Sequence, residues 1–313
     1  MLYDVMIIGS GPAGLSAGIY AARSGLKTVI LERAIVGGQI TSAHQVENYP
    51  GFPEAIEGFE LTERMRQQAE RFQAQFLDEE VTAIGMEGLC KIVETRENKY
   101  RTKALIVCTG ASPRRLNVPG EERFMGRGVS YCATCDGALY RDKVVAVIGG
   151  GDSAVEEGIY LTHFARKVYI IHRRDELRAQ KILQERAFQN PKIEFIWNSV
   201  VQEIYGTDKI EKLEIFNRQT QQISYLPVDG VFIYVGILPN NKLLESRINL
   251  DEAGFVYTDE FMHTNIPGVY AAGDIRHKVL RQVVTATSDG AIAAFNAEKW
   301  IRDNYEALEK DGA

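Results

Sequence analysis

The sequence predicts an α/β protein made of two Rossmann-like dinucleotide-binding domains, the second inserted into the first. Three observations lead to this prediction. A pattern of strand, glycine-rich turn, helix and strand occurs twice, the two copies keep the same internal spacing, and Pro- and Gly-containing turns flank the second copy. The length of 313 residues suits two domains better than one.

Composition places the chain among ordinary globular proteins, with 45% hydrophobic and 25% charged residues. The net charge of -6 argues against nucleic acid or an anionic membrane surface as a partner, because both favour a basic protein. No run of about 18 apolar residues is present. The N-terminus lacks a basic region before its apolar run, which indicates a strand and not a signal peptide. We therefore expect a cytoplasmic protein.

The first glycine turn follows a predicted strand over residues 4–8 and precedes a predicted helix that ends near Ser24. Glycines at this point allow a tight turn and a close approach of the backbone to a pyrophosphate, and the helix N-terminus offers N–H groups to it. The next strand ends on Glu32, 18 residues after Gly14, where a carboxylate can bind a ribose hydroxyl. The candidate residues of this first site are Gly9, Gly11, Pro12, Ala13, Gly14 and Glu32.

The second glycine turn repeats the design of the first. A predicted strand over residues 143–148 precedes it, a helix runs from it to Leu161, and a further strand covers residues 167–171. Gly9 and Gly149 are 140 residues apart, and the same separation joins Gly14 to Ala154. Because a chance repeat would not hold this register, we predict a second dinucleotide site, with candidate residues Gly149, Gly151, Asp152, Ser153 and Ala154.

The two copies differ at the end of the strand that follows each helix. The counterpart of Glu32 is His172, which Arg173, Arg174 and Arg178 follow. A carboxylate suits a free ribose 2′-hydroxyl, whereas arginines suit a 2′-phosphate. The first site therefore fits FAD or NAD and the second fits NADP. A solvated charged surface is the alternative for the basic run, but its position at the strand end favours the phosphate site.

Domain boundaries are expected where turn signals interrupt the pattern. A strand over residues 104–110 ends in Thr109 and Gly110, and Ser112-Pro113 and Pro119-Gly120 then break it. A later buried strand leads to Pro239-Asn240-Asn241, which is the predicted return linker. After it, a strand over residues 268–274 ends on Asp274, whose carboxylate could meet a polyol. The predicted domains are residues 1–113 with 242–313, and residues 114–241.

The residues expected to carry chemistry are Cys132 and Cys135, with Asp136 directly after them. Two cysteines three apart at a helix start can form a disulfide, and the helix N-terminus lowers the pKa of a thiol there. Zinc would need more ligands, and the other two cysteines, Cys90 and Cys108, stand singly. We expect no metal. A redox-active dithiol is favoured over a pair of merely structural cysteines.

The place of this pair in the chain supports a redox function. Cys135 lies 14 residues before Gly149, so the pair belongs to the second nucleotide domain. Electrons from a hydride donor reach a disulfide through a two-electron carrier, which is the chemistry of a flavin. Asp136 is placed either to move a proton for the thiolate or to cap the helix start, and the sequence leaves both roles open.

Nine motifs together resemble the low-molecular-weight bacterial thioredoxin reductases, in order and spacing, over nearly the whole chain. They are GSGPAG, Gly37-Gly38-Gln39, Glu47-Asn48-Tyr49-Pro50-Gly51, CATCD, GGGDSA, HRRDELR, GILPN, AAGD and Arg281-Gln282-Val283. The CxxC argues against the related ferredoxin–NADP reductases, and the arginine motif argues against relatives that take electrons from ferredoxin.

The resemblance implies FAD in the discontinuous domain, NADPH in the inserted one, thioredoxin as partner and a homodimer. It implies that Asp274 holds the ribityl chain and that residues 37–41 and Asn48 line the flavin ring. The implied FAD contacts further include Gly38, Gln39, Thr41, Thr109, Gly110, Gly273, Arg281, Gln282 and Val283, and the implied NADPH contacts are those of the second glycine turn with His172, Arg173, Arg174 and Arg178.

The implied activity is that of a thioredoxin-disulfide reductase. NADPH reduces the flavin, the flavin reduces the Cys132–Cys135 disulfide, and the dithiol reduces thioredoxin by exchange. Because nicotinamide and dithiol must visit the same flavin, the resemblance also implies a rotation of the inserted domain about its two linkers. The alternative function is an NADPH-dependent flavin reductase of another thioredoxin-like redoxin.

Overall fold

The computed structural model describes residues 2–43, 46, 48–244 and 247–312. The chain divides into two compact units. Unit 1 contains residues 1–112 and 238–313, and unit 2 contains residues 113–237. Both contain sheets with parallel strands and helices, so the predicted α/β class is confirmed.

Unit 1 is built on a seven-stranded sheet of order β3-β2-β1-β6-β5-β4, in which β17 also pairs with β6. Strands β3, β2, β1, β6 and β17 run parallel, whereas β5 and β4 are antiparallel additions. The strands are β1 (Leu2–Ile8), β2 (Thr28–Glu32), β3 (Gln75–Asp78), β4 (Val81–Glu87), β5 (Cys90–Thr95), β6 (Lys99–Val107) and β17 (Val269–Ala271).

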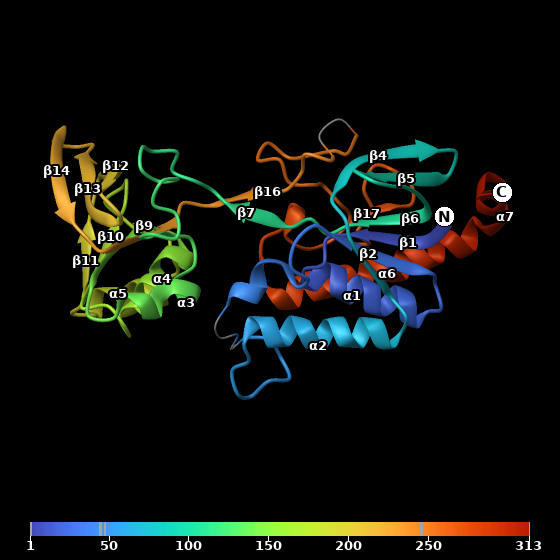
Figure 1. Ribbon diagram of the computed structural model, residues 1–313, viewed down its shortest axis with the longest axis horizontal. Helices are drawn as coiled ribbons and strands as arrows, with labels where there is room; N and C mark the ends of the chain where they lie inside the picture. Colours follow the sequence, from blue (N-terminus) through green and yellow to red (C-terminus); the bar gives the residue numbers. More distant parts are fainter. Residues whose placement is uncertain (1, 44–45, 47, 245–246, 313) are drawn as a thin grey trace. The chain divides into compact units, whose positions relative to one another are not determined.

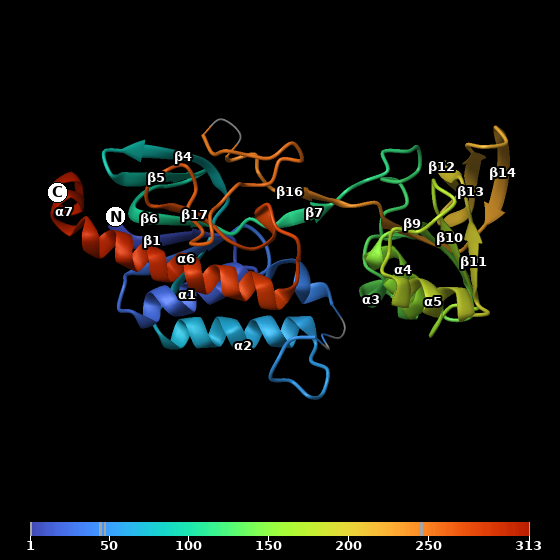
Figure 2. The same cartoon turned by 180° about the vertical axis from the view of Figure 1, so that it is seen from behind.

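The helices of unit 1 gather beside this sheet (Figures 1 and 2). Helix α1 begins with Pro12, whose fixed φ suits a first helical position, and Gly25 follows its end with φ +80°. It packs against both α6 and α2. The helices are α1 (Pro12–Arg23), η1 (Gly38–Ser42), α2 (Gly58–Arg71), η3 (Gly273–Ile275), α6 (Val283–Asp303) and α7 (Tyr305–Gly312).

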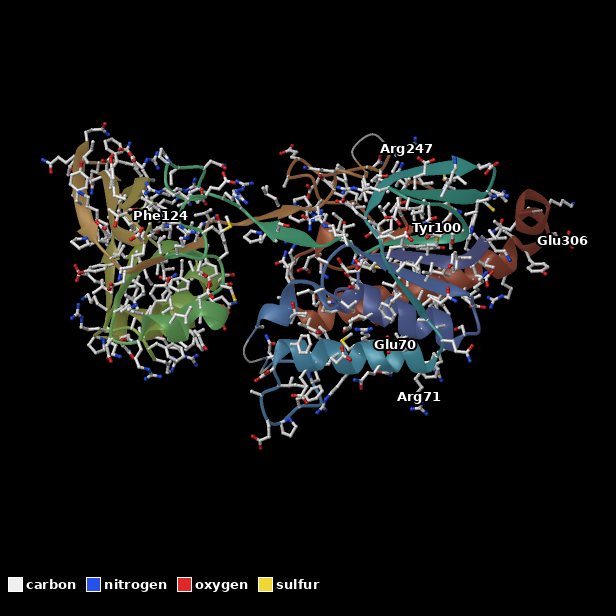
Figure 3. The ribbon with its side chains drawn as sticks, viewed as in Figure 1. Glu70, Arg71, Tyr100, Phe124, Arg247 and Glu306 are labelled. Carbon is white, nitrogen blue, oxygen red and sulfur yellow. The ribbon has the colours of Figure 1, made fainter. Side chains whose placement is uncertain are left out.

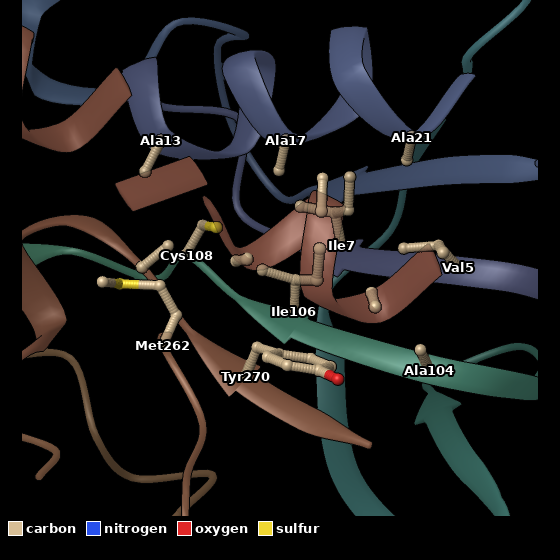
Figure 4. Packing of buried hydrophobic residues seen from close by; sticks show 14 of the residues in the cluster. Val5, Ile7, Ala13, Ala17, Ala21, Ala104, Ile106, Cys108, Met262 and Tyr270 are labelled. Atoms are coloured by element: carbon tan, nitrogen blue, oxygen red, sulfur yellow. The ribbon is translucent and has the colours of Figure 1, made fainter. Parts of the chain in front are cut away.

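Both faces of the parallel strands in unit 1 are buried, as expected of a sheet covered on two sides. Val5 and Ile7 of β1 face Ala13, Ala17 and Ala21, which lie four residues apart and so share one side of α1 (Figure 4). The alternate β1 residues belong to a second cluster on the opposite face. Small alanine side chains let α1 approach the sheet closely, and this fixes the start of α1 at the carboxyl end of β1.

Unit 2 repeats the parallel arrangement on a smaller scale. Its five-stranded sheet has the order β11-β10-β9-β15-β8, and a three-stranded antiparallel sheet of order β12-β13-β14 accompanies it. The strands are β8 (Val129–Ser130), β9 (Val144–Gly149), β10 (Lys167–Ile171), β11 (Ile193–Ile196), β12 (Ser199–Gly206), β13 (Ile210–Asn217), β14 (Gln222–Pro227) and β15 (Gly230–Tyr234).

The core of unit 2 also has two sides. Val145 and Val147 of β9 pack toward α4, whereas Ala146 and Ile148 join a cluster with the antiparallel sheet. Phe124, labelled in Figure 3, is 1% exposed and belongs to that second cluster. The helices are α3 (Ala133–Asp136), η2 (Gly137–Tyr140), α4 (Asp152–Leu161) and α5 (Lys181–Gln189).

The chain passes between the units through β7 (Ala111–Pro113) and β16 (Ile237–Pro239), which pair with each other. The second unit boundary lies before Leu238, whereas the sequence placed the linker at residues 239–241. The reason is Asn240: its side-chain amide donates to the Thr109 carbonyl at 2.8 Å, and its Oδ1 accepts from the Ser112 hydroxyl at 2.7 Å. These bonds fix Asn240 within unit 1.

Within the described part of the chain, every helix is too short or too polar to cross a membrane.

Candidate redox and dinucleotide sites

The first glycine turn depends on close contacts that a side chain would prevent. Gly9 has φ +98°, and a Cβ on it would lie 2.4 Å from the carbonyl oxygen of Cys108. A Cβ on Gly14 would lie 1.9 Å from the carbonyl oxygen of Gly9. Gly11 is the N-cap of α1 and has no side chain to cap it, so N–H groups of the first helical turn face outward from the turn. This is the geometry of an anion site at a helix N-terminus.

Glu32 lies beside this turn at the end of β2. Its Oε2 accepts hydrogen bonds from the Ser10 backbone N–H at 3.0 Å and from the Ser10 hydroxyl at 2.7 Å. Its Oε1 accepts from the N–H groups of Arg33 and Ala34. These donors hold the carboxylate of Glu32 in one position next to the glycine turn, as a ribose-binding residue requires.

Other predicted residues of the first site come together around the same turn. Gly37 N–H donates to the Ser10 carbonyl at 3.0 Å, and a Cβ on Gly38 would lie 3.0 Å from the Gly11 Cα. Gly273 also lies close to the turn, because a Cβ placed on it would be 2.8 Å from the Cβ of Ala13.

Further bonds fix the segments around it. The Thr41 hydroxyl donates to the Gly38 carbonyl at 2.7 Å, and the Gln39 amide donates to the Ala111 carbonyl. The Asn48 amide donates to Gln282 Oε1 at 3.0 Å, so two predicted flavin-ring residues are in direct contact. Val283 begins α6 and is buried, and the Thr109 hydroxyl donates to the Asn240 carbonyl next to Gly110.

Asp274 is the one predicted residue of this site whose carboxylate lacks a partner among the described residues. Its Oδ1 is buried without a hydrogen bond. Burial raises the pKa of Asp274, whereas Lys278 and Arg281 lower it. The Arg281 guanidinium lies over the Phe255 ring, 4.1 Å from its centroid, and its Nε is also buried with no partner in the part of the chain that the structure describes. A buried acceptor beside a buried donor indicates that a polar ligand completes this surface.

The second glycine turn has the same backbone but a different neighbour. Gly149 has φ +155°, and a Cβ on it would lie 2.4 Å from the Tyr234 carbonyl oxygen. A Cβ on Gly150 would lie 2.3 Å from His172 Nδ1. The His172 ring is therefore packed under the turn, 4% exposed, and burial together with the nearby arginines lowers its pKa. The turn leads to α4 with Gly151 as N-cap, and nothing lies within 4 Å of a Cβ placed on Gly151.

The three arginines of the second site are exposed, unlike His172. The Arg178 N–H donates to the Gly150 carbonyl at 2.7 Å, which brings this arginine next to the glycine turn. The Arg174 carbonyl accepts from the Asn198 N–H at 3.1 Å, and the Arg173 carbonyl accepts from Arg218 at 3.4 Å. Backbone contacts thus fix the segment while the guanidinium groups stay open to solvent. Asp152, in the first turn of α4, accepts from the Gln180 N–H at 2.7 Å.

Cys132 stands directly before helix α3, as the sequence predicts, and is disulfide-bonded. Its N–H donates to the Ser130 hydroxyl at 3.0 Å. The next N–H, that of Ala133, donates to the Tyr234 hydroxyl at 2.7 Å. Burial raises the pKa of Tyr234, so this phenol stays neutral. A hydrogen bond to Tyr234, the last residue of β15, therefore fixes the amino end of α3.

Asp136 and Cys135 complete the predicted pair and its neighbour. Asp136 is the last residue of α3 and the N-cap residue of η2. Its side chain makes no capping hydrogen bond there, so the structure does not support the capping role. The Cys135 backbone lies in α3, and its side chain is outside the described part of the structure. The other two cysteines, Cys90 and Cys108, are buried and belong to no disulfide.

Several residues of these sites were not predicted from the sequence. Ser10 holds Glu32, Tyr234 holds the start of α3, and Asp289 accepts a hydrogen bond from the Gly273 N–H at 3.0 Å. Ser10 and Tyr234 gave no separate signal, because one is a variable turn position and the other ends an apolar strand. Asp289 is visible in the sequence as a charged residue among the small and apolar residues in the first half of α6.

The fold and the two glycine turns define a class, that of flavin- and pyridine-nucleotide-dependent disulfide reductases. The family model for pyridine nucleotide-disulphide oxidoreductases matches residues 3–290, so the chain belongs to this family. A thioredoxin reductase of Listeria innocua is 48% identical over 313 residues, which cover 100% of this chain and 98% of the relative. A thioredoxin reductase of Bacillus subtilis is 46% identical over 309 residues, with 98% of each chain covered.

A solved structure is similarly close. The thioredoxin reductase of Lactococcus lactis, in its FR conformation, has a TM-score of 0.90 and 48% identity over 96% of this chain and 99% of its own. The predicted family, its oxidoreductase class and the resemblance to bacterial thioredoxin reductases are therefore confirmed. Thioredoxin reductases of this family use FAD and NADPH, the two predicted cofactors.

Proposed function

We propose that this chain is a thioredoxin-disulfide reductase in which electrons pass from NADPH through FAD to a disulfide of Cys132 and then to thioredoxin. The observation that carries the proposal is the disulfide-bonded Cys132 at the amino end of α3, in the same unit as the second glycine turn and its arginines. The relatives, all named thioredoxin reductase where cited above, do not favour the alternative of another redoxin as substrate.

The residues around α1 fit FAD. The turn at Gly9 and Gly14 leaves no room for a side chain, the N-terminus of α1 offers N–H groups to a pyrophosphate, and Glu32 is held as a ribose acceptor. The buried Oδ1 of Asp274 has no donor among the described residues, and the hydroxyls of a ribityl chain would supply one. Gly38, Gln39, Thr41, Asn48, Gln282 and Val283 would border the flavin ring.

The residues around α4 fit NADPH. Gly149 and Gly151 leave the turn open, and the exposed Arg173, Arg174 and Arg178 would bind the 2′-phosphate. His172 has another role than the sequence suggested, because its buried and neutral ring packs under Gly150 and carries no charge toward a phosphate. His172 directly follows β10, which ends at Ile171, and the arginines begin after it.

The redox chemistry of this chain takes place at the start of α3, where a disulfide is reduced to two thiols and protons are exchanged. Since Cys90 and Cys108 belong to no disulfide, we assign the partner of Cys132 as Cys135. The helix N-terminus favours the thiolate over the thiol when this disulfide is reduced. Asp136, which makes no capping bond, would accept or deliver the proton that accompanies thiol exchange. FAD, when bound, supplies the two-electron chemistry that connects a hydride donor to a disulfide.

The assembly and the domain division also belong to this proposal. We propose that the two compact units, residues 1–112 with 238–313 and residues 113–237, are the FAD and NADPH domains, and we also propose a homodimer and a cytoplasmic location. Exposed apolar side chains of unit 1, among them Ile35, Leu280 and Phe295, support the dimer, because large apolar side chains at a surface mark association sites. Size measurement of the purified protein in solution tests this part.

Spectroscopy with NADPH and thioredoxin tests the function. The purified chain should show a flavin absorbance that NADPH bleaches, and NADPH consumption should continue only when oxidised thioredoxin is added. Consumption of oxygen without thioredoxin would instead identify an NADPH-dependent flavin oxidase. Turnover with a different thioredoxin-like protein, but not with thioredoxin, would support the other redoxin reductase.

Single cysteine variants test the division of work. Following the family resemblance, Cys132 attacks thioredoxin and Cys135 faces the flavin. Cys135→Ser should therefore trap a stable mixed disulfide with a thioredoxin that lacks its resolving cysteine, visible on a non-reducing gel. Cys132→Ser should show a long-wavelength absorbance band from the remaining thiolate and no trap. The opposite pattern would reverse the two roles, and full thioredoxin reduction by both variants would exclude the dithiol mechanism.

A further inference from the structure

A buried carboxylate on α6 binds three donors from the loop that carries Asp274. Asp289 is 7% exposed. Its Oδ2 accepts from the Gly273 N–H at 3.0 Å and from Lys278 Nζ at 2.8 Å, and its Oδ1 forms an ion pair with Arg276 Nη1 at 2.9 Å. The Lys278 and Arg276 side chains are 9% and 11% exposed, so these are buried ion pairs. One residue of α6 thus fixes three positions of a six-residue loop segment.

Burying this cluster of charges costs desolvation free energy, so a function for the cluster is worth seeking. Removing three charged groups from water carries a large desolvation penalty, and such clusters often contribute little net stability. A loop between a strand and a helix is held as well by a turn and a few backbone bonds. The purpose is therefore sought in what lies next to the cluster, which is Asp274.

Asp274 lies directly after Gly273, whose N–H the Asp289 carboxylate binds. The charged groups that act on Asp274 are Lys278 and Arg281 of the following loop and Asp289 of α6. From the end of β6, the buried Cys108 thiol faces Asp289, whose charge together with burial raises the pKa of that thiol, so Cys108 adds no charge. Lys278 therefore acts on two carboxylates: it is bonded to Asp289, and its charge lowers the pKa of Asp274.

We infer that Asp289 and Lys278 are positioning residues for the cofactor acceptor Asp274. Asp289 fixes the Gly273–Asp274 turn through the main chain and orients Lys278, and Lys278 supplies the positive charge that a buried hydrogen-bond-accepting carboxylate needs. The inference rests on the proposed FAD site and adds the residues that make Asp274 able to bind it.

The sign of the expected pH effect follows from the charges. Burial raises the pKa of Asp274, and Lys278 lowers it. Because the ionised carboxylate accepts hydrogen bonds from the cofactor hydroxyls, FAD is held best above the pKa of Asp274 and is released as the pH falls through it. Without Lys278 that pKa rises further, so release begins at a higher pH.

The experiment compares FAD release from the intact parent enzyme and from Lys278→Met, followed by the fluorescence of freed flavin between pH 5 and 8. Lys278 lowers the pKa of Asp274, and a nearby opposite charge shifts a carboxyl pKa by roughly 1–3 units, so the midpoint of release should move up by about one pH unit. Lys299 is an exposed cation on α6, the helix that carries Asp289, so Lys299→Met is the control and should leave the release curve unchanged.

A second variant separates positioning from stability. In an Asp274→Asn background, the side chain at this position cannot ionise, so Lys278→Met should no longer move the midpoint. Asp289→Asn should weaken FAD binding at every pH, since the turn itself is loosened, while circular dichroism shows the chain still folded. If Lys278→Met lowers FAD retention equally at all pH values, or shifts the midpoint by the same amount in the Asp274→Asn background, the inference is wrong.

The result also stays distinct from failure of the proposed function. If the purified parent chain shows no flavin absorbance and binds no added FAD, the proposed function itself fails. If the parent binds FAD and Lys278→Met releases it with the parent's pH profile, the FAD site stands and only the role of Lys278 and Asp289 is refuted.

Discussion

The two glycine turns, at Gly9–Gly14 and Gly149–Ala154, share a backbone and differ in what lies beneath it. In each, the first glycine has a positive φ and its Cβ would lie 2.4 Å from a carbonyl oxygen, that of Cys108 or that of Tyr234. In the first turn, the Ser10 hydroxyl donates to Glu32 at 2.7 Å. In the second, Gly150 has no side chain, and the His172 ring fills that place.

This comparison separates two levels of specificity. The glycine backbone and the uncapped helix start define a site for a dinucleotide. The residue at the second position of the turn and the residue at the end of the next strand change together, from Ser10 with Glu32 to Gly150 with His172. The first pair presents a carboxylate to a ribose, whereas the second buries its ring and leaves the following arginines to face the ligand.

The largest effect is expected from a substitution that disturbs the backbone conformation shared by the two glycine turns. In Gly14→Ala, the new Cβ would lie 1.9 Å from the Gly9 carbonyl oxygen, so α1 must move away from β1. We expect a loss of at least about 4 kcal/mol in the free energy of unfolding, measured by urea denaturation, with loss of FAD. The second turn has Ala154 at this position, where the strand and helix already accommodate a methyl group.

Gly151→Ala is the control, because nothing lies within 4 Å of its Cβ and its φ of -95° is open to any residue. It should change the free energy of unfolding by less than about 1 kcal/mol. Equal losses in the two variants would mean that glycine content, and not the contact with Gly9, sets the stability.

The next largest effect is expected from removing the arginines that distinguish the second dinucleotide site from the first. Arg173→Ala combined with Arg174→Ala should weaken NADPH while leaving NADH little changed. A lost charge-assisted hydrogen bond costs about 1.5–3 kcal/mol, and the exposure of both side chains favours the lower value for each. Steady-state kinetics with the two nucleotides measures the change, as kcat/KM. A parent enzyme that uses NADH as well as NADPH would contradict the assignment.

Much of this comparison was predictable from the sequence, because spacing carries the backbone information. The repeat that joins Gly9 to Gly149 places both turns on strand ends, and the strand predicted over residues 167–171 has those bounds as β10. The exposed positions of Arg173, Arg174 and Arg178 also follow from a charged run after a buried strand.

What the sequence did not predict depends on packing between distant segments. His172 was expected to face the nucleotide, yet the absence of a side chain at Gly150 lets its ring turn inward. The bond from Asp289 to Gly273 joins residues 16 apart across a loop and a helix. The charge of Asp289 within a run of small residues marks the residue itself, but no local pattern shows that its partner is Gly273.

A third prediction concerns the helices that follow the two turns. Ala17 of α1 is fully buried, and its counterpart 140 residues later is Glu157 of α4. Burial, together with Glu156, raises the pKa of Glu157 from 4.5 to about 7, and its Oε2 is buried without a partner among the described residues. Because the folded-state pKa is the higher one, this carboxyl adds no penalty below pH 4.5 and destabilises the fold as the pH rises through about 7.

Glu157→Gln should therefore exceed the parent by much more at pH 8 than at pH 5, where only the first part of the penalty has developed. With about 1.4 kcal/mol per pKa unit, the gain in the free energy of unfolding should be about 2 kcal/mol, somewhat below the full shift because a charged side chain can move toward water. Urea denaturation at both pH values measures it. A gain of the same size at pH 5 and pH 8 would show that ionisation is not its cause.

The smallest expected effect tests the Ser10–Glu32 pair itself. Ser10→Ala removes one donor to the Glu32 carboxylate but leaves the Ser10 N–H and the N–H groups of Arg33 and Ala34 in place. A hydrogen bond to a charged group contributes about 1.5–3 kcal/mol, and with three other donors retained we expect about 1.5 kcal/mol in the free energy of unfolding.

The double variant with Glu32→Gln decides whether this bond is the cause. If the Ser10 hydroxyl acts through the Glu32 charge, Ser10→Ala should cost less than about 0.5 kcal/mol once that charge is gone, because interacting residues are not additive. An unchanged cost in the double variant would mean that Ser10, which is fully buried, stabilises the turn through its packing or through its contact at 3.3 Å with the Gly37 N–H. In that case the carboxylate at the end of β2 would depend on backbone donors alone, and the two turns would differ less than their side chains suggest.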